Sequence, residues 1–297
     1  MKKGKQPEWL GQGEGTSPNV VWTFRTDADL LFLSYARESG EVFVGDSSNS
    51  LYRLDRRGRV LSLTRGLKLL RTGTWTDTGQ AGLVVLGHSQ VVRLNDSMQV
   101  EWSLRTTGDV LSVALDPYGD YAVIALQSGT NWVVNRFKKR VGLFETPRPL
   151  NFVRFLILKP ELIAAAEHAH LSRHRWNGET LWSCRLTCPV SDMAVSEDGE
   201  KIVLAAMNLG VQTYDGSGEL ETSYLLEGTA MVVAASAFAD RLAVATLEGR
   251  LYWLEGFSGR LLWTTQLDEP IRALQCDPFG QWLLLGTRSG HIARLQW

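Results

Sequence analysis

The sequence predicts an all-β fold, a seven-bladed β-propeller of four-stranded blades. Three observations support it: a repeat, turn signals in phase with that repeat, and an N-terminal strand that the last repeat lacks. The repeat recurs seven times between Val20 and Trp297, with starts 38 to 42 residues apart. This period is typical of propeller blades. Because the repeat fills almost the whole chain, we expect one ring rather than several domains.

The outermost strand of each unit shows the repeat best. These runs are residues 20–25, 60–65, 100–105, 142–147, 180–185, 220–225 and 261–266. Three further strand-like runs lie between consecutive members; in the last unit they are residues 271–276, 281–286 and 291–296. Four short strands, with turn signals every 8 to 12 residues, indicate a propeller blade.

The turns agree with the strands. Residues 116–120, 196–200 and 277–281 stand at the same place in three units, between the first and second inner strands. Proline presets the first dihedral of such a turn, and glycine accepts the positive φ that closes a hairpin. Their common phase supports the unit boundaries.

The last unit ends on its third strand, at Trp297, and is one outer strand short. The N-terminal run from Val20 to Arg25 supplies a strand of the right kind. Pairing it with the last unit closes the ring and removes the exposed edges of an open array. We therefore expect Trp22 to anchor the closure, at a cost of about 3–5 kcal/mol if it is lost.

Composition narrows the classes of function. A formal charge of −1 argues against generic nucleic-acid binding, which needs clustered positive charge. Residues 1–19 have no apolar core of the kind a signal peptide needs, and no run reaches the ~18 apolar residues of a membrane span. We expect a cytoplasmic protein without membrane insertion, with a flexible leader over residues 1–19 and a single propeller over residues 20–297. Trp9 and Leu10 are an alternative docking element within the leader.

Catalytic and metal chemistry have little support. Three cysteines form no disulfide framework, and no phosphate-binding loop, nucleophile elbow or zinc-binding helix motif occurs. His168, His170 and His174 would share one face of a strand, where imidazoles could converge on a metal. The segment spans an expected turn, which breaks that alternation. We therefore expect a polar blade edge there, no cofactor and no enzymatic activity.

Two motifs resemble known propeller repeats. Residues 253–263 resemble the tryptophan-docking motif of PQQ-type repeats, with Glu255 for its Asp, Ser258 for its Thr, Arg260 for its Lys, and direct matches at Gly259 and Trp263. The turns at 116–120 and 196–200 are similar to the Ser-Pro-Asp-Gly turn of WD repeats, although the Gly-His and Trp-Asp dipeptides of that family are missing.

The resemblance implies membership of the WD-like and PQQ-like propeller superfamily over about residues 20–297, and a role class without a specific activity. Quinone-using relatives add calcium-binding carboxylates and a substrate domain, for which this chain has no spare length. PQQ is therefore not expected as a cofactor. Docking tryptophans pack between blades, so a structural role is expected for Trp22, Trp102, Trp182 and Trp263.

Arginines follow these tryptophans at a fixed distance. Arg25, Arg105 and Arg185 each stand three residues after a docking tryptophan, and Arg65 and Arg148 lie within one residue of the equivalent place. We expect a ring of arginines on one rim, suited to carboxylate-bearing partner loops. The alternative is that each arginine pairs with a nearby acid, with Asp27 or Asp29 as the partner of Arg25. Further loop contacts are expected from Asp46, Asn208 and Arg288.

Two basic turns are expected on the opposite face. They contribute Arg56, Arg57, Arg136, Lys138, Lys139 and Arg140. Together they could form a patch for phosphate or an acidic protein, and the alternative is two solvated hairpin turns.

The sequence thus favours a non-catalytic interaction platform, a scaffold subunit that binds partner proteins through propeller-face loops in a multiprotein assembly. Two alternatives remain open. One is a small-molecule or metal-binding sensor, and the other is a propeller enzyme with its site in the central funnel.

Overall fold

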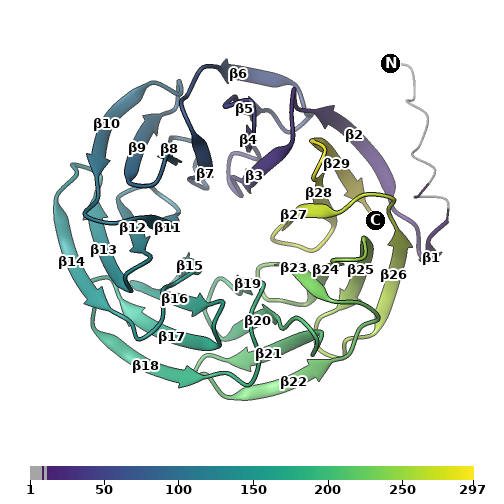
Figure 1. Ribbon diagram of the computed structural model, residues 1–297. Helices are drawn as coiled ribbons and strands as arrows, with labels where there is room; N and C mark the ends of the chain where they lie inside the picture. The colour runs from purple at the N-terminus through teal and green to yellow at the C-terminus, as the bar shows by residue number, and fades with distance from the viewer. Residues whose placement is uncertain (1–8, 10–11) are drawn as a thin grey trace.

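The computed structural model describes Trp9 and residues 12–297. The described chain forms a closed ring of antiparallel sheets around a central channel (Figure 1). Each of the seven sheets is one blade. Within a blade, the first strand lines the channel and the fourth strand lies at the outer rim. The all-β, seven-bladed prediction is confirmed.

The strands follow the expected units. Blades I to III consist of β3 (Leu30–Tyr35), β4 (Val42–Asp46), β5 (Leu51–Leu54) and β6 (Val60–Thr64); β7 (Leu70–Trp75), β8 (Ala81–Leu86), β9 (Gln90–Asn95) and β10 (Val100–Arg105); and β11 (Val110–Leu115), β12 (Tyr121–Leu126), β13 (Thr130–Asn135) and β14 (Arg140–Glu145). Blades IV and V consist of β15 (Phe152–Phe155), β16 (Glu161–Ala166), β17 (His170–Arg175) and β18 (Thr180–Arg185); and β19 (Asp192–Val195), β20 (Lys201–Ala205), β21 (Val211–Asp215) and β22 (Leu220–Tyr224). Blades VI and VII consist of β23 (Ala230–Ala235), β24 (Arg241–Thr246), β25 (Arg250–Glu255) and β26 (Leu261–Gln266), with β1 (Glu14–Gly15) outside them; and β27 (Ile271–Cys276), β28 (Trp282–Thr287), β29 (His291–Gln296) and β2 (Asn19–Arg25).

Burial changes from strand to strand within a blade. The second strand is buried along most of its length, as in β12 and β24, because neighbouring blades cover both of its faces. The fourth strand is mostly exposed, as in β6 and β22. A strand covered on both faces needs a continuous apolar run, and this explains why these segments do not alternate in polarity. No helix among the described residues has the length and apolarity to cross a membrane.

The N-terminal strand closes the ring as expected. β2 pairs with β29 in antiparallel register, from Asn19 opposite Gln296 to Arg25 opposite His291. In Figure 1, β2 lies at the rim beside β29, so the two ends of the propeller meet within blade VII. Because the two strands are hydrogen-bonded to each other, no unpaired strand edge remains where the ring closes.

Part of the expected leader packs on the ring. β1 pairs with β26, and Trp9 packs against the apolar core between blades VI and VII. The hydroxyl of Thr265 donates a hydrogen bond to the carbonyl of Trp9. The expectation of a flexible leader also covers residues 1–8, 10 and 11, which lie outside the described residues. The docking element suggested at Trp9 and Leu10 is described only at Trp9, because Leu10 lies outside the described residues.

Three tryptophans join neighbouring blades. The indole Nε1 of Trp22, Trp102 and Trp182 donates to a backbone carbonyl in the next blade's turn between third and fourth strands. The acceptors are Arg56 (3.0 Å), Arg136 (2.8 Å) and Gly216 (3.0 Å). Trp263 is fully buried, and its Nε1 has no partner among the described residues. The next blade is blade VII, whose third and fourth strands are joined by no turn because β2 comes from the other end of the propeller.

The ring has two faces. On one face, the loop after each fourth strand lies beside the hairpin between the second and third strands. Backbone hydrogen bonds join the two: the amides of Thr26, Thr106 and Thr146 donate to the carbonyls of Gly290, Ser89 and Gly129. We call this face the arginine face, after Arg25, Arg65, Arg105, Arg148 and Arg185. The other carries the two remaining kinds of hairpin and every exposed aromatic side chain of the described chain. We call it the aromatic face, after Tyr118, Phe137, Phe238, Phe257 and Phe279.

Candidate functional site

The five arginines of the arginine face lie on five consecutive blades. Arg25 ends β2 of blade VII, Arg65 follows β6 of blade I, and Arg105 ends β10 of blade II. Arg148 lies in the loop after blade III, and Arg185 ends β18 of blade IV. All five are exposed. Blades V and VI carry Leu225 and Gln266 at this place, so the arginines form an arc rather than a full ring.

Threonines fix three of the loops of the arc, those that contain or follow Arg25, Arg105 and Arg148. The hydroxyl of Thr26 donates to the carbonyl of Ala28 at 2.6 Å, and that of Thr106 donates to Gly108 at 2.6 Å. Thr146 makes the same bond to Arg148 at 2.8 Å. A side chain that bonds its own backbone two residues on holds a loop in one turn conformation. The backbone under the arc is therefore ordered by local bonds.

Most of the arc has no partner within the propeller. We considered Asp27 as an ion-pair partner of Arg25. Its carboxylate instead accepts a hydrogen bond from the Arg65 guanidinium at 2.7 Å. That hydrogen bond, together with one from Tyr52, lowers the pKa of Asp27. Among the described residues, no acid forms an ion pair with the remaining four: Arg25, Arg105, Arg148 and Arg185.

Of the three further residues expected to contact a partner, two are exposed and one is buried. Asn208 and Arg288 are exposed on the arginine face, in hairpins of blades V and VII. Asp46 is fully buried, and the expectation that it contacts a partner is wrong. Its carboxylate accepts from the Tyr52 hydroxyl at 2.9 Å and from the Ser48 hydroxyl and Ser50 amide. Asp46 therefore serves its own hairpin.

The two basic turns lie on the aromatic face but on different blades. Arg56 and Arg57 belong to blade I, and residues 136–140 belong to blade III. The corresponding turn of blade II, with exposed Asp96, stands between them. Arg56 also bonds the carbonyls of Ser39 and Glu38. The six residues are thus two separate clusters.

The histidines do not converge. His168 is exposed in the hairpin before β17, whereas His170 and His174 are buried on that strand. Four residues of extended chain separate the last two by about 13 Å. Ser172 and Thr180 hydrogen-bond the two ring nitrogens of His174, at 2.8 and 3.1 Å. No group of three or more metal-ligating side chains occurs within the described part of the chain.

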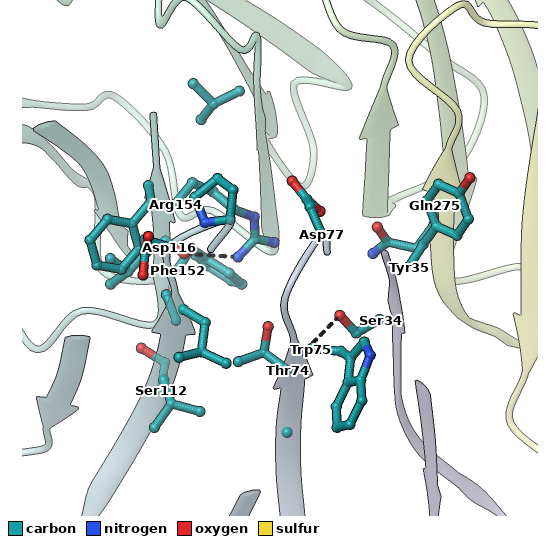
Figure 2. A pocket seen from close by; sticks show the side chains of 18 of the residues that line it. Ser34, Tyr35, Thr74, Trp75, Asp77, Ser112, Asp116, Phe152, Arg154 and Gln275 are labelled. Atoms are coloured by element: carbon teal, nitrogen blue, oxygen red, sulfur yellow. Dashed lines mark hydrogen bonds between the residues drawn. The ribbon is translucent and has the colours of Figure 1, made fainter. Parts of the chain in front are cut away.

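A cavity of about 380 Å³ occupies the central channel. Figure 2 shows side chains of the inner strands around it, among them Ser34, Thr74, Ser112 and Arg154. Where the channel opens toward the aromatic face, Arg37 of blade I reaches Glu197 of blade V at 2.8 Å. This ion pair spans the channel, because blades I and V are not neighbours. This contact was not predictable from the sequence, because the two residues are 160 positions apart.

Burial raises the pKa of carboxyl groups around the channel. It does so for Asp77, although the nearby Arg37 guanidinium acts in the opposite direction. The same cause raises the pKa of Asp116 and of Asp192, whose side chain accepts from the Val233 amide. These carboxyls bond turn and strand amides, as Asp116 does with the amide of Tyr121 at 2.6 Å. Their contacts are those of structural groups at the ends of inner strands.

Comparison with known proteins supports the propeller fold and identifies no family. No protein-family model and no curated protein matches the sequence. Among solved structures, the β-propeller domain of Cps50 (Swd1) from Myceliophteria thermophila matches with a TM-score of 0.79 and 16% identity, over 94% of this chain and 99% of that one. The likeness shows the fold alone. Because 1817 chains of solved structures match, the fold does not select one function.

Proposed function

We propose that this protein is a non-catalytic interaction platform, a cytoplasmic scaffold subunit of a multiprotein assembly from the WD-like and PQQ-like propellers. The observation that supports it is the arc of arginines on five consecutive blades, four of them without an ion pair to any residue that the structure describes. Loops displayed by a rigid sheet scaffold are the usual carriers of binding residues.

The chemistry of the arc suits a protein partner. Arginine presents a planar fork of donors that matches carboxylates, and it is enriched at protein interfaces. A partner that spans several blades has room to bury the ~1,000 Å² or more of a specific interface. The partner is therefore a protein whose own loops carry Asp or Glu side chains at the spacing of the blades.

Crosslinking tests this proposal. Native protein is purified from its own cells with a carboxylate-reactive crosslinker, and partner contacts are mapped by mass spectrometry. Crosslinks around Arg25, Arg105 and Arg185, lost in the triple variant of these three to Glu, support it. The matched control is Arg57→Glu, an exposed arginine on the aromatic face. Partner capture that survives the triple variant contradicts the proposal.

A second candidate function rests on the cavity of about 380 Å³ in the channel. A volume in this range accommodates a small molecule. In this sensor function the Arg154 guanidinium, at the cavity wall, binds an anionic ligand (Figure 2). Melting of wild type and Arg154→Met across a metabolite panel tests it, because a ligand that binds the native state raises its stability. Melting that no metabolite shifts rules the sensor out for that panel.

A further inference from the structure

One turn of the aromatic face departs from its counterparts in the other blades. The turn between third and fourth strands has a left-handed residue near its end. That residue is glycine in four blades, as Gly58, Gly178, Gly218 and Gly259. It is Met98 in blade II and Lys138 in blade III, with φ of 59° and 66°. A residue with a Cβ is disfavoured in this conformation.

Packing accounts for Met98 and not for Lys138. The Met98 side chain is buried in the apolar core between blades I and II, which offsets the unfavourable backbone. Lys138 is exposed and gains no such compensation. Uncompensated backbone strain in a native structure is typical of a position retained for binding.

The neighbouring residue is equally out of place. Phe137 is 73% exposed, whereas four of the corresponding turn positions hold the polar residues Arg57, Ser97, Asn177 and Ser217. Blade VI has another exposed phenylalanine, Phe257, but Ser258 and Gly259 follow it where two lysines follow Phe137. The Arg136 guanidinium lies 4.8 Å from the centre of the Phe137 ring. The turn therefore presents an aromatic ring to solvent, with a cation against one of its faces.

The turn is rigid. The side-chain oxygen of Asn135 accepts from the amides of Phe137 and Lys139, at 3.1 and 2.9 Å. The amide of Arg136 donates to the carbonyl of Asp120 at 2.8 Å, which joins the turn to the adjacent hairpin. A partner would lose little conformational entropy on the propeller side by binding here.

The charge of the turn is unbalanced. Arg136 pairs with Asp120 at 3.3 Å. Lys138, Lys139 and Arg140 are exposed, and none of them forms an ion pair with any described residue. Three cations without an ion pair thus follow Phe137 in a chain whose formal charge is −1, and the last of them, Arg140, lies 5.6 Å from the centre of the Trp132 ring.

We propose that residues 136–140 of blade III are a second docking site, for an acidic protein segment that carries one aliphatic or aromatic side chain. The apolar side chain packs on Phe137, and its flanking Asp or Glu residues meet Lys138, Lys139 and Arg140. Charge complementarity and an exposed aromatic anchor are the two components of such recognition. The site is on the face opposite the arginine arc and does not depend on it.

The surroundings favour a short acidic segment over a nucleic acid. Exposed Asp96 in blade II and Glu179 in blade IV bound the basic turn on both sides, so the positive footprint is one blade wide. A polynucleotide carries a phosphate at every residue and would extend over these acids. A segment with acids only around its apolar residue avoids them.

Fluorescence anisotropy with the full chain tests the proposal. The probe is a labelled peptide of eight acidic residues with one central leucine, and the comparators are the same peptide with serine at that place and a 12-nucleotide single-stranded RNA. Phe137→Ser and Lys139→Glu are each expected to weaken binding of the leucine peptide about fivefold or more. Arg57→Glu, with the same charge change on blade I, is expected to leave it within about twofold.

The Lys138→Gly variant separates a binding role from a structural one. We expect it to melt at higher temperature than wild type and yet to bind the leucine peptide more weakly, because it removes both the strain and a cation. Unchanged binding in this variant or in Phe137→Ser overturns the proposal. So does equal affinity for the serine peptide, tighter binding of the RNA, or no peptide binding at about 1 mM. Lys139→Glu should leave the partner crosslinks in the loop after Arg25, at Asp27 and Asp29, unchanged, so the two sites fail independently.

Discussion

The buried imidazole of His174 ties the stability of blade IV to pH. The ring is 1% exposed, lies 4.4 Å from that of Phe144, and bonds Ser172 and Thr180. Burial lowers its pKa to about 4, and the charge of His170 on the same strand acts in the same direction. The native protein therefore holds His174 neutral at a pH where the unfolded chain protonates it.

We expect the free energy of unfolding to fall as the pH is lowered from 6.5 to about 4. In this window the unfolded state binds the extra proton, so stability is complete above the unfolded pKa and is lost toward the folded one. A shift to about 4 corresponds to roughly 3 kcal/mol. Urea unfolding at pH 7.5, 5.5 and 4 measures it. His174→Gln should flatten this slope, and an unchanged slope would show that other groups cause it.

Replacing the two left-handed residues Lys138 and Met98 by glycine should change the free energy of unfolding in opposite directions. Lys138→Gly removes backbone strain from an exposed position, and we expect it to stabilise the protein by about 1 kcal/mol. Met98→Gly removes the same strain but also a buried side chain, so we expect a net loss of about 2 kcal/mol. Chemical unfolding of both variants measures the difference. A loss of stability in Lys138→Gly would mean that its side chain packs in solution.

At the scale of the element, the closing strand depends on Trp22. Its ring covers Gly58 of the next blade, and its indole donates to Arg56. We expect Trp22→Ala to cost about 3 kcal/mol, near the lower end of the sequence-based range because the side chain is partly exposed. Val21→Ala, on the exposed side of the same strand, is the matched control, measured by urea unfolding. Equal effects of the two substitutions would contradict an anchoring role.

The N-terminal segment fills the seam where Trp263 lacks an acceptor. A side chain at Gly13 would collide with the Trp263 ring, and one at Gly15, whose φ is +97°, with the Leu262 carbonyl. We expect Gly15→Ala to release β1 from β26, with faster amide hydrogen exchange at residues 14–16. Gly108→Ala is the control, because a Cβ there meets nothing within 4 Å. Unchanged exchange in Gly15→Ala would show that the strand tolerates the side chain.

The sequence predicted the features that recur from blade to blade. The strands recur every 40 residues or so, and four of the outer strands carry a docking tryptophan at the same place, so local pattern is sufficient to find them and the missing strand that closes the ring. The arginine arc was placed by the same phase. The ion pairs were not predictable, because the partner of Asp27 is Arg65, 38 positions away on the next blade, rather than Arg25 in the same loop. Asp46 has a polar side chain in a hairpin, and only the fold shows that Tyr52 buries it.

At the scale of the molecule, the hairpins around the channel form a rim of two linked arcs on the aromatic face, one over blades I to III and one over blades IV to VII. Backbone bonds join neighbouring hairpins, as from Glu38 to Asp77, Thr78 to Pro117, Ile157 to Glu197, Glu197 to Ala237 and Ala237 to Pro278. The Arg37–Glu197 ion pair then connects two points of this rim across the channel. Both side chains are partly shielded from water, so their attraction is less screened than that of a surface pair.

The ion pair should therefore couple blades I and V. We expect a double-mutant cycle of Arg37→Met and Glu197→Gln to give a coupling energy of about 1 kcal/mol in urea unfolding. Each single variant should also speed amide exchange in the hairpins of both blades, because each frees one end of the same link. Lys201 and Glu221, which pair within blade V, provide the control. Breaking that pair should affect exchange in blade V alone. Exchange that changes in only one blade after Arg37→Met would show that the rim does not transmit the link.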